Sequence, residues 1–236
     1  MENIRLRTGF RKFDDNYFGG LCPGISLIKG KPGSGKTTLM LNFIKENIDN
    51  LNEVLYCDPE GTLVSPEVQE YMSTNFKVDK NLVKVFSDSI LDATAFNLID
   101  ATVQKNKQCL FIIDNIDFKA ENLEPQGISF YLKNLNSYLI KNNSFLLITQ
   151  TSLSINDISR SGGVDPNPPI FTSKEDSLFK NKLTVYRTRY HNDKLLMDLN
   201  FKKCSGVHKS FSINVDKDIS NKDNPMTMSQ KMTKVF

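Results

Sequence analysis

The sequence predicts an α/β protein whose core is a mostly parallel, twisted sheet flanked by helices, with antiparallel strands near the C-terminus. Three features lead to this fold class. Short apolar runs alternate with longer amphipathic stretches between residues 25 and 150, as strands and helices do in a parallel sheet. A glycine-rich segment, GKPGSGKTT, joins the first apolar run to the first amphipathic stretch. After residue 182 the alternation of apolar and polar residues resumes, which indicates antiparallel strands.

Five strands are expected in the first part of the chain. The last two are almost continuously apolar, as a sheet buried on both faces requires. The expected strands are Ile25–Lys29, Glu53–Cys57, Val83–Phe86, Cys109–Ile113 and Phe145–Thr149.

Helices are expected between these strands. Apolar residues recur at helical spacing after the glycine-rich segment and predict a helix over Thr37–Asn47. Pro66 suits the first turn of a second helix, and Asp92 suits the cap of a third. A fourth helix is expected over about Ile128–Lys141.

The stretch 152–176 does not fit regular structure, because it is rich in Ser, Asn, Asp, Gly and Pro. A loop of this length is usually functional or mobile. The segments LTVYRTRY and KLLMDLNF follow, joined by a tight turn at 191–193, and VHKSFSINV comes next. We therefore expect one core domain over residues 1–215 and a polar tail over 216–236, which is flexible or orders against a protein partner.

The composition argues against several classes of protein. The 236 residues include 30 Lys and Arg against 27 Asp and Glu, and the net charge of +3 is too small to indicate a nucleic-acid-binding protein by itself. No apolar run approaches the roughly twenty residues of a membrane span, and no signal sequence follows Met1. We expect a cytoplasmic protein with no membrane partner.

Residues 30–37 fit the phosphate-loop pattern GxxxxGK[ST] and lie between an expected strand and an expected helix. Glycines let successive backbone amides wrap a phosphate, and the helix N-terminus favours the anion. We expect Lys36 to reach the β- and γ-phosphates of ATP, and Thr37 and Asp114 to hold Mg²⁺, the latter through water. The expected nucleotide-binding residues are Gly30, Lys31, Pro32, Gly33, Ser34, Gly35, Lys36, Thr37 and Thr38.

Hydrolysis also requires a base near the terminal phosphate. Glu60 is the candidate, because it follows an expected strand and the carboxyl ends of parallel strands open on one crevice. The alternative is that Asp58, Pro59 and Glu60 form an ordinary turn. Gln150 ends another expected strand and would reach the same crevice, where its amide could sense the γ-phosphate.

The order of these motifs resembles that of the RecA-type ATPases. The lead-in TGFRKFDDNYFGGLCPG, the phosphate loop, LYCDPEGTL, CLFIID and FLLITQT follow one another as in the core shared by RecA, RadA, KaiC and DnaB-type helicases. The resemblance covers residues 8 to about 215. It implies a RecA-like P-loop core in which Glu60 is the catalytic base, Asp114 the Walker B aspartate and Gln150 the γ-phosphate sensor. LYCDPEGTL is similar to the eukaryotic and archaeal recombinases, whereas ITQT is similar to the helicases.

Only seven residues precede Thr8, so the N-terminal domain of most recombinases and helicases is expected to be missing. Such a bare core resembles the short RecA-like recombination and annealing proteins of phages. The location implied by that resemblance is the cytoplasm of a host cell.

The two DNA-contacting loops of the family would correspond to about Phe118 to Gly127 and Ser152 to Asp176. Lys119, Arg160 and Lys174 are the cations there, and Phe171 is a candidate platform for stacking bases of single-stranded DNA. Taken singly, each of these residues also suits an ordinary surface position.

In this family ATP lies between subunits, and a Lys or Arg of the neighbour completes the site. NFKKCSG resembles the KNR-G stretch of the family, which implies that Lys202 or Lys203 acts in trans, with Cys204 where an arginine is often found. Arg187 and Arg189 are the alternative cations. The resemblance thus implies a homo-oligomer, either a hexameric ring or a filament.

Three functions remain open at this point. The first is an ATP-dependent protein that binds single-stranded DNA in recombination, strand annealing or repair. The second is the core of a DnaB-like hexameric replicative helicase. The third is a KaiC-like regulatory ATPase that does not act on DNA.

Overall fold

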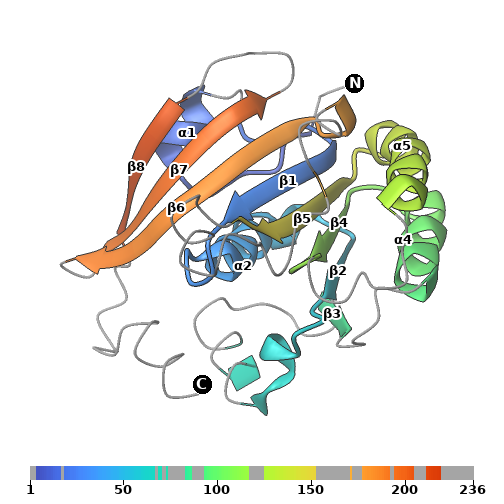
Figure 1. Cartoon of the computed structure of the whole chain (residues 1–236), viewed down its shortest axis with the longest axis horizontal. Helices are drawn as coiled ribbons and strands as arrows, with labels where there is room; N and C mark the ends of the chain where they lie inside the picture. Colours follow the sequence, from blue (N-terminus) through green and yellow to red (C-terminus); the bar gives the residue numbers. More distant parts are fainter. Residues whose placement is uncertain are drawn as a thin grey trace, which may run out of the picture.

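An eight-stranded sheet with the order β3-β2-β4-β5-β1-β6-β7-β8 forms the centre of the protein (Figure 1). The structure is a computed structural model, which describes residues 4–16, 19–66, 69–70, 73, 83–86, 93–116, 125–152, 171, 177–191, 194–204 and 211–218. The strands are β1 (Gly24–Gly30), β2 (Glu53–Cys57), β3 (Val83–Phe86), β4 (Cys109–Ile113), β5 (Phe145–Thr151), β6 (Asn181–His191), β7 (Lys194–Cys204) and β8 (Phe211–Asp218). The helices are α1 (Arg11–Asn16), α2 (Lys36–Asn47), α4 (Ala93–Lys105) and α5 (Pro125–Lys141), with 3-10 turns η1 (Ile48–Asn50) and η2 (Thr62–Val64).

The sheet is parallel from β3 through β6 and antiparallel from β6 to β8. This arrangement confirms the predicted fold class. The five expected strands are also confirmed, with β1 and β5 extended by one or two residues at their ends. The last strand begins at Phe211, and residues 205–210 lie outside the described part of the chain.

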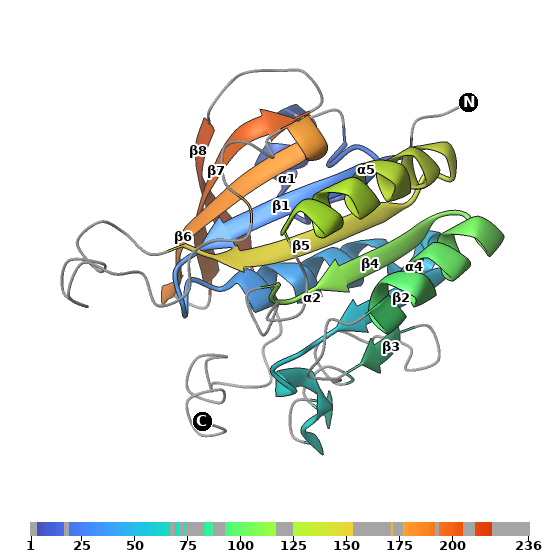
Figure 2. The same ribbon diagram turned by 45° about the vertical axis from the view of Figure 1, so that its right-hand side comes forward.

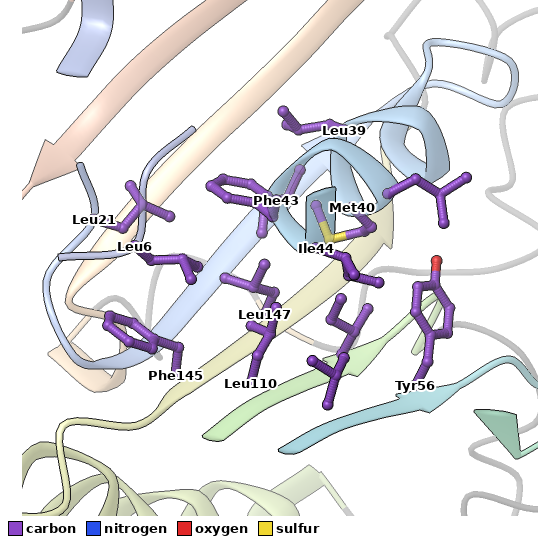
Figure 3. Packing of buried hydrophobic residues seen from close by; sticks show 14 of the residues in the cluster. Leu6, Leu21, Leu39, Met40, Phe43, Ile44, Tyr56, Leu110, Phe145 and Leu147 are labelled. Carbon is purple, nitrogen blue, oxygen red and sulfur yellow. The ribbon is translucent and has the colours of Figure 1, made fainter. Parts of the chain in front are cut away.

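Helices cover both faces of the sheet and produce two apolar cores (Figure 2). Side chains alternate between the faces along each strand, because successive residues of a strand point in opposite directions. In β4, for example, Leu110 and Ile112 join the core beneath α2, whereas Phe111 and Ile113 join the core beneath α4 and α5. Figure 3 shows the first core, where side chains of α2 meet those of the central strands.

The expected helices differ from the observed ones mainly at their N-termini. α2 begins one residue earlier than expected, and α5 begins at Pro125, where a proline suits the first helical turn. Pro66 has helical backbone, whereas Asp92 lies outside the described residues. None of the described helices is both long and apolar enough to cross a lipid bilayer.

The N-terminal segment forms an element that the sequence pattern did not predict. Leu6 pairs with Leu21 through a short antiparallel bridge, and α1 follows Thr8. The Asp14 carboxylate accepts hydrogen bonds from the Thr8 backbone N–H at 3.0 Å, the Thr8 hydroxyl at 2.9 Å and the Gly9 N–H at 3.2 Å. The motif TGFRKFDD therefore closes on itself and lies against α2.

Asn47 attaches this N-terminal segment to the end of α2. Its side-chain oxygen accepts the Arg7 backbone N–H at 2.8 Å, and its amide donates to the carbonyls of Arg7 and Phe43, both at 2.7 Å. Asn42, one turn earlier, donates to the carbonyl of Thr8. The helix that follows the glycine-rich loop is thus fixed at its far end by backbone of the lead-in.

Candidate active site at the carboxyl ends of the parallel strands

The candidate catalytic residues lie where the parallel strands end. Cys57 of β2 is opposite Ile113 of β4, and Ile113 is opposite Ile148 of β5. The following residues, Asp58, Asp114 and Thr149, therefore lie in one row across three strands. This edge is where an open parallel sheet normally binds its ligand.

The phosphate loop connects β1 to α2 at the same edge. Gly33 and Gly35 have φ angles of 69° and 95°, which side-chain-bearing residues rarely adopt. A Cβ atom at Gly30 would lie 2.4 Å from Ser34 Oγ and 2.7 Å from the Val185 carbonyl oxygen. The path of the loop therefore requires glycines at these positions.

Lys36, the first residue of α2, points back across the loop. Its ammonium group donates to the carbonyls of Gly30 and Lys31, each at 3.0 Å, and the residue is buried. Ser34 is also buried, whereas Lys31, Pro32 and Gly33 are exposed. Thr37 and Thr38 are half-buried in the first turn of α2.

The carboxylate of Asp114 is held from both sides. The Tyr56 hydroxyl of β2 donates to Asp114 Oδ2 at 2.7 Å, and the Thr149 hydroxyl of β5 donates to Oδ1. Thr149 lies two residues before Thr151, which pairs with Gly30 at the start of the phosphate loop. The carboxylate is thereby fixed close to the end of the strand that leads into the loop.

Asp58 supports the turn that follows β2. Its backbone N–H donates to the Phe86 carbonyl at 2.7 Å, and its carboxylate accepts the Leu63 N–H at 2.5 Å. Asp58 is buried, and Gly61, with a φ of 70°, completes the turn. Asp58 thus has a structural role in presenting its neighbour Glu60.

Glu60 is exposed, and its carboxylate is held by the residue that follows Asp114. The Asn115 side-chain amide donates to Glu60 Oε1 at 2.9 Å. Glu60 and Asp114 also both raise the pKa of Tyr56, for which burial is the largest cause and the charge of Asp114 the next. The two acidic residues therefore lie near one hydroxyl, although they are far apart in the sequence.

Gln150 lies on the other face of the sheet from Thr149 and Thr151. It follows the alternation of Leu146 and Ile148, which belong to the core beneath α4 and α5, and it is fully buried. Lys29, the partner of Gln150 across β1, donates from its ammonium group to the Phe171 carbonyl at 2.7 Å. In this arrangement Thr151 rather than Gln150 shares the face of Asp114.

The side-chain oxygens of Thr37 and Asp114 suit a Mg²⁺ ion whose other ligands are phosphate oxygens and water. Among the described residues, no group of three or more His, Cys, Asp or Glu side chains could hold a metal ion. Mg²⁺ is typically bound through one or two protein oxygens together with substrate phosphates, rather than by a protein cage. Thr37 at the helix start and Asp114 at the end of β4 are residues of the required kind.

The predicted DNA contacts are mostly outside the described residues. Lys119, Arg160 and Lys174 all fall there. Phe171 is described, and its position in the structure contradicts the expectation that its ring stacks on bases of DNA. Its ring is fully buried and packs edge-to-face on Phe179, with the ring centroids 5.1 Å apart. Burial in the core beneath α4 and α5 leaves no ring face for a base.

The candidate trans-acting cations lie at opposite ends of the antiparallel strands. Val185 pairs with Gly30, so the backbone of Arg187 and Arg189 continues past the phosphate-loop end of β1. Lys203 pairs with Lys182, which is opposite Leu27 and so nearer the other end of β1. Lys202 lies at an irregularity of the β6–β7 pairing.

Three residues of this site were not predicted from the sequence. Tyr56, Thr149 and Asn115 contact the predicted acids, yet each appears in the sequence as an ordinary strand or loop residue. For Tyr56 a signal was present, because a hydroxyl on an otherwise apolar strand requires a partner when it is buried. The partner itself depends on strand order, which the sequence pattern does not provide.

Comparisons with known proteins agree with this fold. A 149-residue match with the DNA repair and recombination protein RadB of Methanosphaera stadtmanae is 32% identical and covers 59% of this chain and 62% of RadB. A 130-residue match with the DNA repair protein RadA of Aquifex aeolicus is 30% identical and covers 53% of this chain and 27% of RadA. The matches thus span less than two thirds of these relatives. No protein-family model matches the chain.

The crystal structure of a KaiC-like protein from Pyrococcus horikoshii is similar over nearly the whole chain. It aligns with a TM-score of 0.57 at 17% identity and covers 89% of this chain and 93% of that protein. The chain therefore has a RecA-like α/β fold, and its sequence is similar to those of the RadA and RadB repair proteins.

Proposed function

We propose that the chain binds and hydrolyses ATP with Mg²⁺ and acts on single-stranded DNA in recombination or repair. The observation that carries this proposal is the linked arrangement at the sheet edge. The strand that leads into the phosphate loop, β1, pairs with β5. Thr149 of β5 contacts Asp114, and the residue after Asp114 holds Glu60.

In this proposal the loop amides of 33–37 bind the phosphates, and Lys36 exchanges its two loop carbonyls for phosphate oxygens. Thr37 and Asp114 hold the metal, which, when bound, neutralises charge on the phosphates. Glu60 orients a water for in-line attack and accepts its proton. Its exposure leaves it open to water, and Asn115 limits its orientation.

The DNA part of the proposal is supported by the similarity to RadB and RadA, which are named as repair and recombination proteins. The proposed contacts are Lys119, Arg160 and Lys174, within the two stretches 118–127 and 152–176. Such cations would neutralise phosphates without reading sequence, so binding should weaken as salt is raised. The working core would extend to the end of β8 at Asp218, three residues beyond the boundary expected from the sequence, and the residues after it would be a tail that meets a partner.

The assembly proposed is a homo-oligomer with ATP at each subunit interface. Lys202 and Lys203 remain the first candidates for the residue acting in trans, and Arg187 and Arg189 the second. A lysine can neutralise charge on the transferred phosphoryl group but lacks the two-pronged hydrogen bonding of arginine, so slow hydrolysis is expected if a lysine acts.

Electron microscopy with a non-hydrolysable ATP analogue, with and without a poly-dT strand, tests this function. Filaments or rings that form on the DNA only with nucleotide would support it, particularly if poly-dT also stimulates ATP hydrolysis. Rings that form equally without DNA, together with no DNA binding at low salt, would instead favour a regulatory ATPase. Closed hexamers that unwind a forked duplex would favour a helicase.

A further inference from the structure

Tyr56 packs its aromatic ring in an apolar core, where its hydroxyl is a polar group among apolar side chains. The residue is fully buried on the face of the sheet covered by α2, among apolar side chains (Figure 3). A buried hydroxyl without a hydrogen-bond partner is destabilising, so the hydroxyl of Tyr56 requires a partner in this core. That partner is the Asp114 carboxylate, 2.7 Å away.

The Tyr56 contact forms one half of a clamp. Tyr56 lies on β2 and Thr149 on β5, which are the two neighbours of β4, and Asp114 directly follows β4. One hydroxyl donates to each carboxylate oxygen. Because the donors approach from opposite strands, the carboxylate cannot rotate without breaking at least one of the two bonds.

The clamp leaves acceptor capacity on the carboxylate. Each oxygen of an ionised carboxylate can accept about two hydrogen bonds, and each hydroxyl occupies one of these positions. A water bound to Mg²⁺ approaches a carboxylate as a hydrogen-bond donor. Asp114 is buried with 7% of its surface exposed, so only a small part of the residue remains open to such a water.

We infer that Tyr56 is a positioning residue for the metal of the bound nucleotide, acting with Thr149 to hold the Asp114 carboxylate in the orientation that accepts the metal's water. This inference rests on the proposed function. It adds to it a residue that does not contact nucleotide or metal and acts through Asp114.

Mn²⁺ binding, followed by electron paramagnetic resonance with a non-hydrolysable ATP analogue, tests the inference. Tyr56→Phe keeps the ring and removes the donor, and we expect about a 10-fold weaker affinity for Mn²⁺. Affinity for the analogue in EDTA should stay at the wild-type value, and excess Mg²⁺ should restore hydrolysis. Tyr138→Phe is the matched control, because Tyr138 lies on α5 with 43% of its surface exposed.

Thr149→Val tests the other half of the clamp and serves as the second variant if Tyr56→Phe does not fold. It should weaken Mn²⁺ binding in the same direction. Wild-type Mn²⁺ affinity in a folded Tyr56→Phe protein would overturn the inference and leave the proposed function intact. A wild-type protein that binds neither the analogue nor Mn²⁺ would overturn the proposed function itself.

Discussion

Asn115 donates a hydrogen bond from its side-chain amide to Glu60 Oε1 at 2.9 Å, and this bond joins the ends of β2 and β4. The two residues are 55 positions apart in the sequence. The bond therefore connects the residue after the proposed metal-binding acid to the proposed base.

Removal of this bond should slow hydrolysis more than it weakens binding. In Asn115→Ala, Glu60 loses a restraint on its orientation, and we expect kcat to fall about 10- to 100-fold with little change in nucleotide affinity. Glu60→Gln should lower kcat by at least about 100-fold. If Asn115 acts through Glu60, the double variant should be no slower than Glu60→Gln alone. If kcat of the double variant were lower than that of Glu60→Gln by the same factor that Asn115→Ala causes alone, that relation would be contradicted.

Gly30 and Gly33 should differ in their tolerance of a side chain. A Cβ at Gly30 would overlap with Ser34 Oγ and the Val185 carbonyl oxygen. Gly30→Ala should therefore destabilise the protein by about 2 kcal/mol. No atom lies within 4 Å of a Cβ at Gly33, so Gly33→Ala should cost only the strain of its positive φ, about 1 kcal/mol. Urea unfolding without nucleotide measures both. Equal losses would mean that crowding at Gly30 relaxes without penalty.

Asn47 should be important for the attachment of the N-terminal segment. Asn47→Ala removes three hydrogen bonds, two of them to the backbone of Arg7, and we expect a loss of about 1–3 kcal/mol in the free energy of unfolding. The exposed Asn50, just after α2, provides the control Asn50→Ala. Limited proteolysis should cut the segment before residue 21 faster in the Asn47 variant only. Equal cutting rates would argue against an anchoring role.

Cys109 should be unreactive in the folded protein. Burial is the main cause that raises its pKa from the ordinary 9.0 to about 11, the Glu53 charge adds to this, and the Ser144 hydroxyl acts in the opposite direction. Iodoacetamide at pH 8, followed by peptide mapping, should label the half-buried Cys22 well before Cys109. Comparable labelling rates would show that the start of β4 opens readily.

The same pKa shift predicts the pH dependence of stability. The folded state keeps the Cys109 proton to a higher pH than the unfolded state. Its contribution to stability should therefore be complete below about pH 9 and decline as the pH rises towards 11. The difference in unfolding free energy between the wild type and Cys109→Ala, measured across this range, checks the sign. A difference that grows with pH would be contrary to the expectation.

The strands and the phosphate loop could be predicted because their signals are local. Apolar runs mark β4 and β5, and the glycine spacing of residues 30–37 is read directly from the sequence. The partners of Asp114 and Glu60 could not be predicted, because they depend on β2, β4 and β5 being neighbours in the sheet.

The orientation of two side chains was also not predicted from the sequence. Gln150 ends an expected strand, but the alternation along β5 directs it to the face opposite Asp114. Phe171 lies in a loop-like stretch of sequence, but the Phe179 ring and the Lys29 ammonium group hold it in the core. In both cases packing against the second face of the sheet determines the outcome, and composition alone does not predict that packing.

Titration of the wild type and of Lys36→Ala with a fluorescent ATP analogue and Mg²⁺ tests the central claim most directly. Lys36 is the cation that the loop holds against Gly30 and Lys31, and its loss should weaken binding at least about 10-fold. Lys45→Ala, which removes an exposed lysine from the same helix, should bind as the wild type does. A folded Lys36→Ala protein with wild-type affinity would contradict the assignment of residues 30–37 as the triphosphate site.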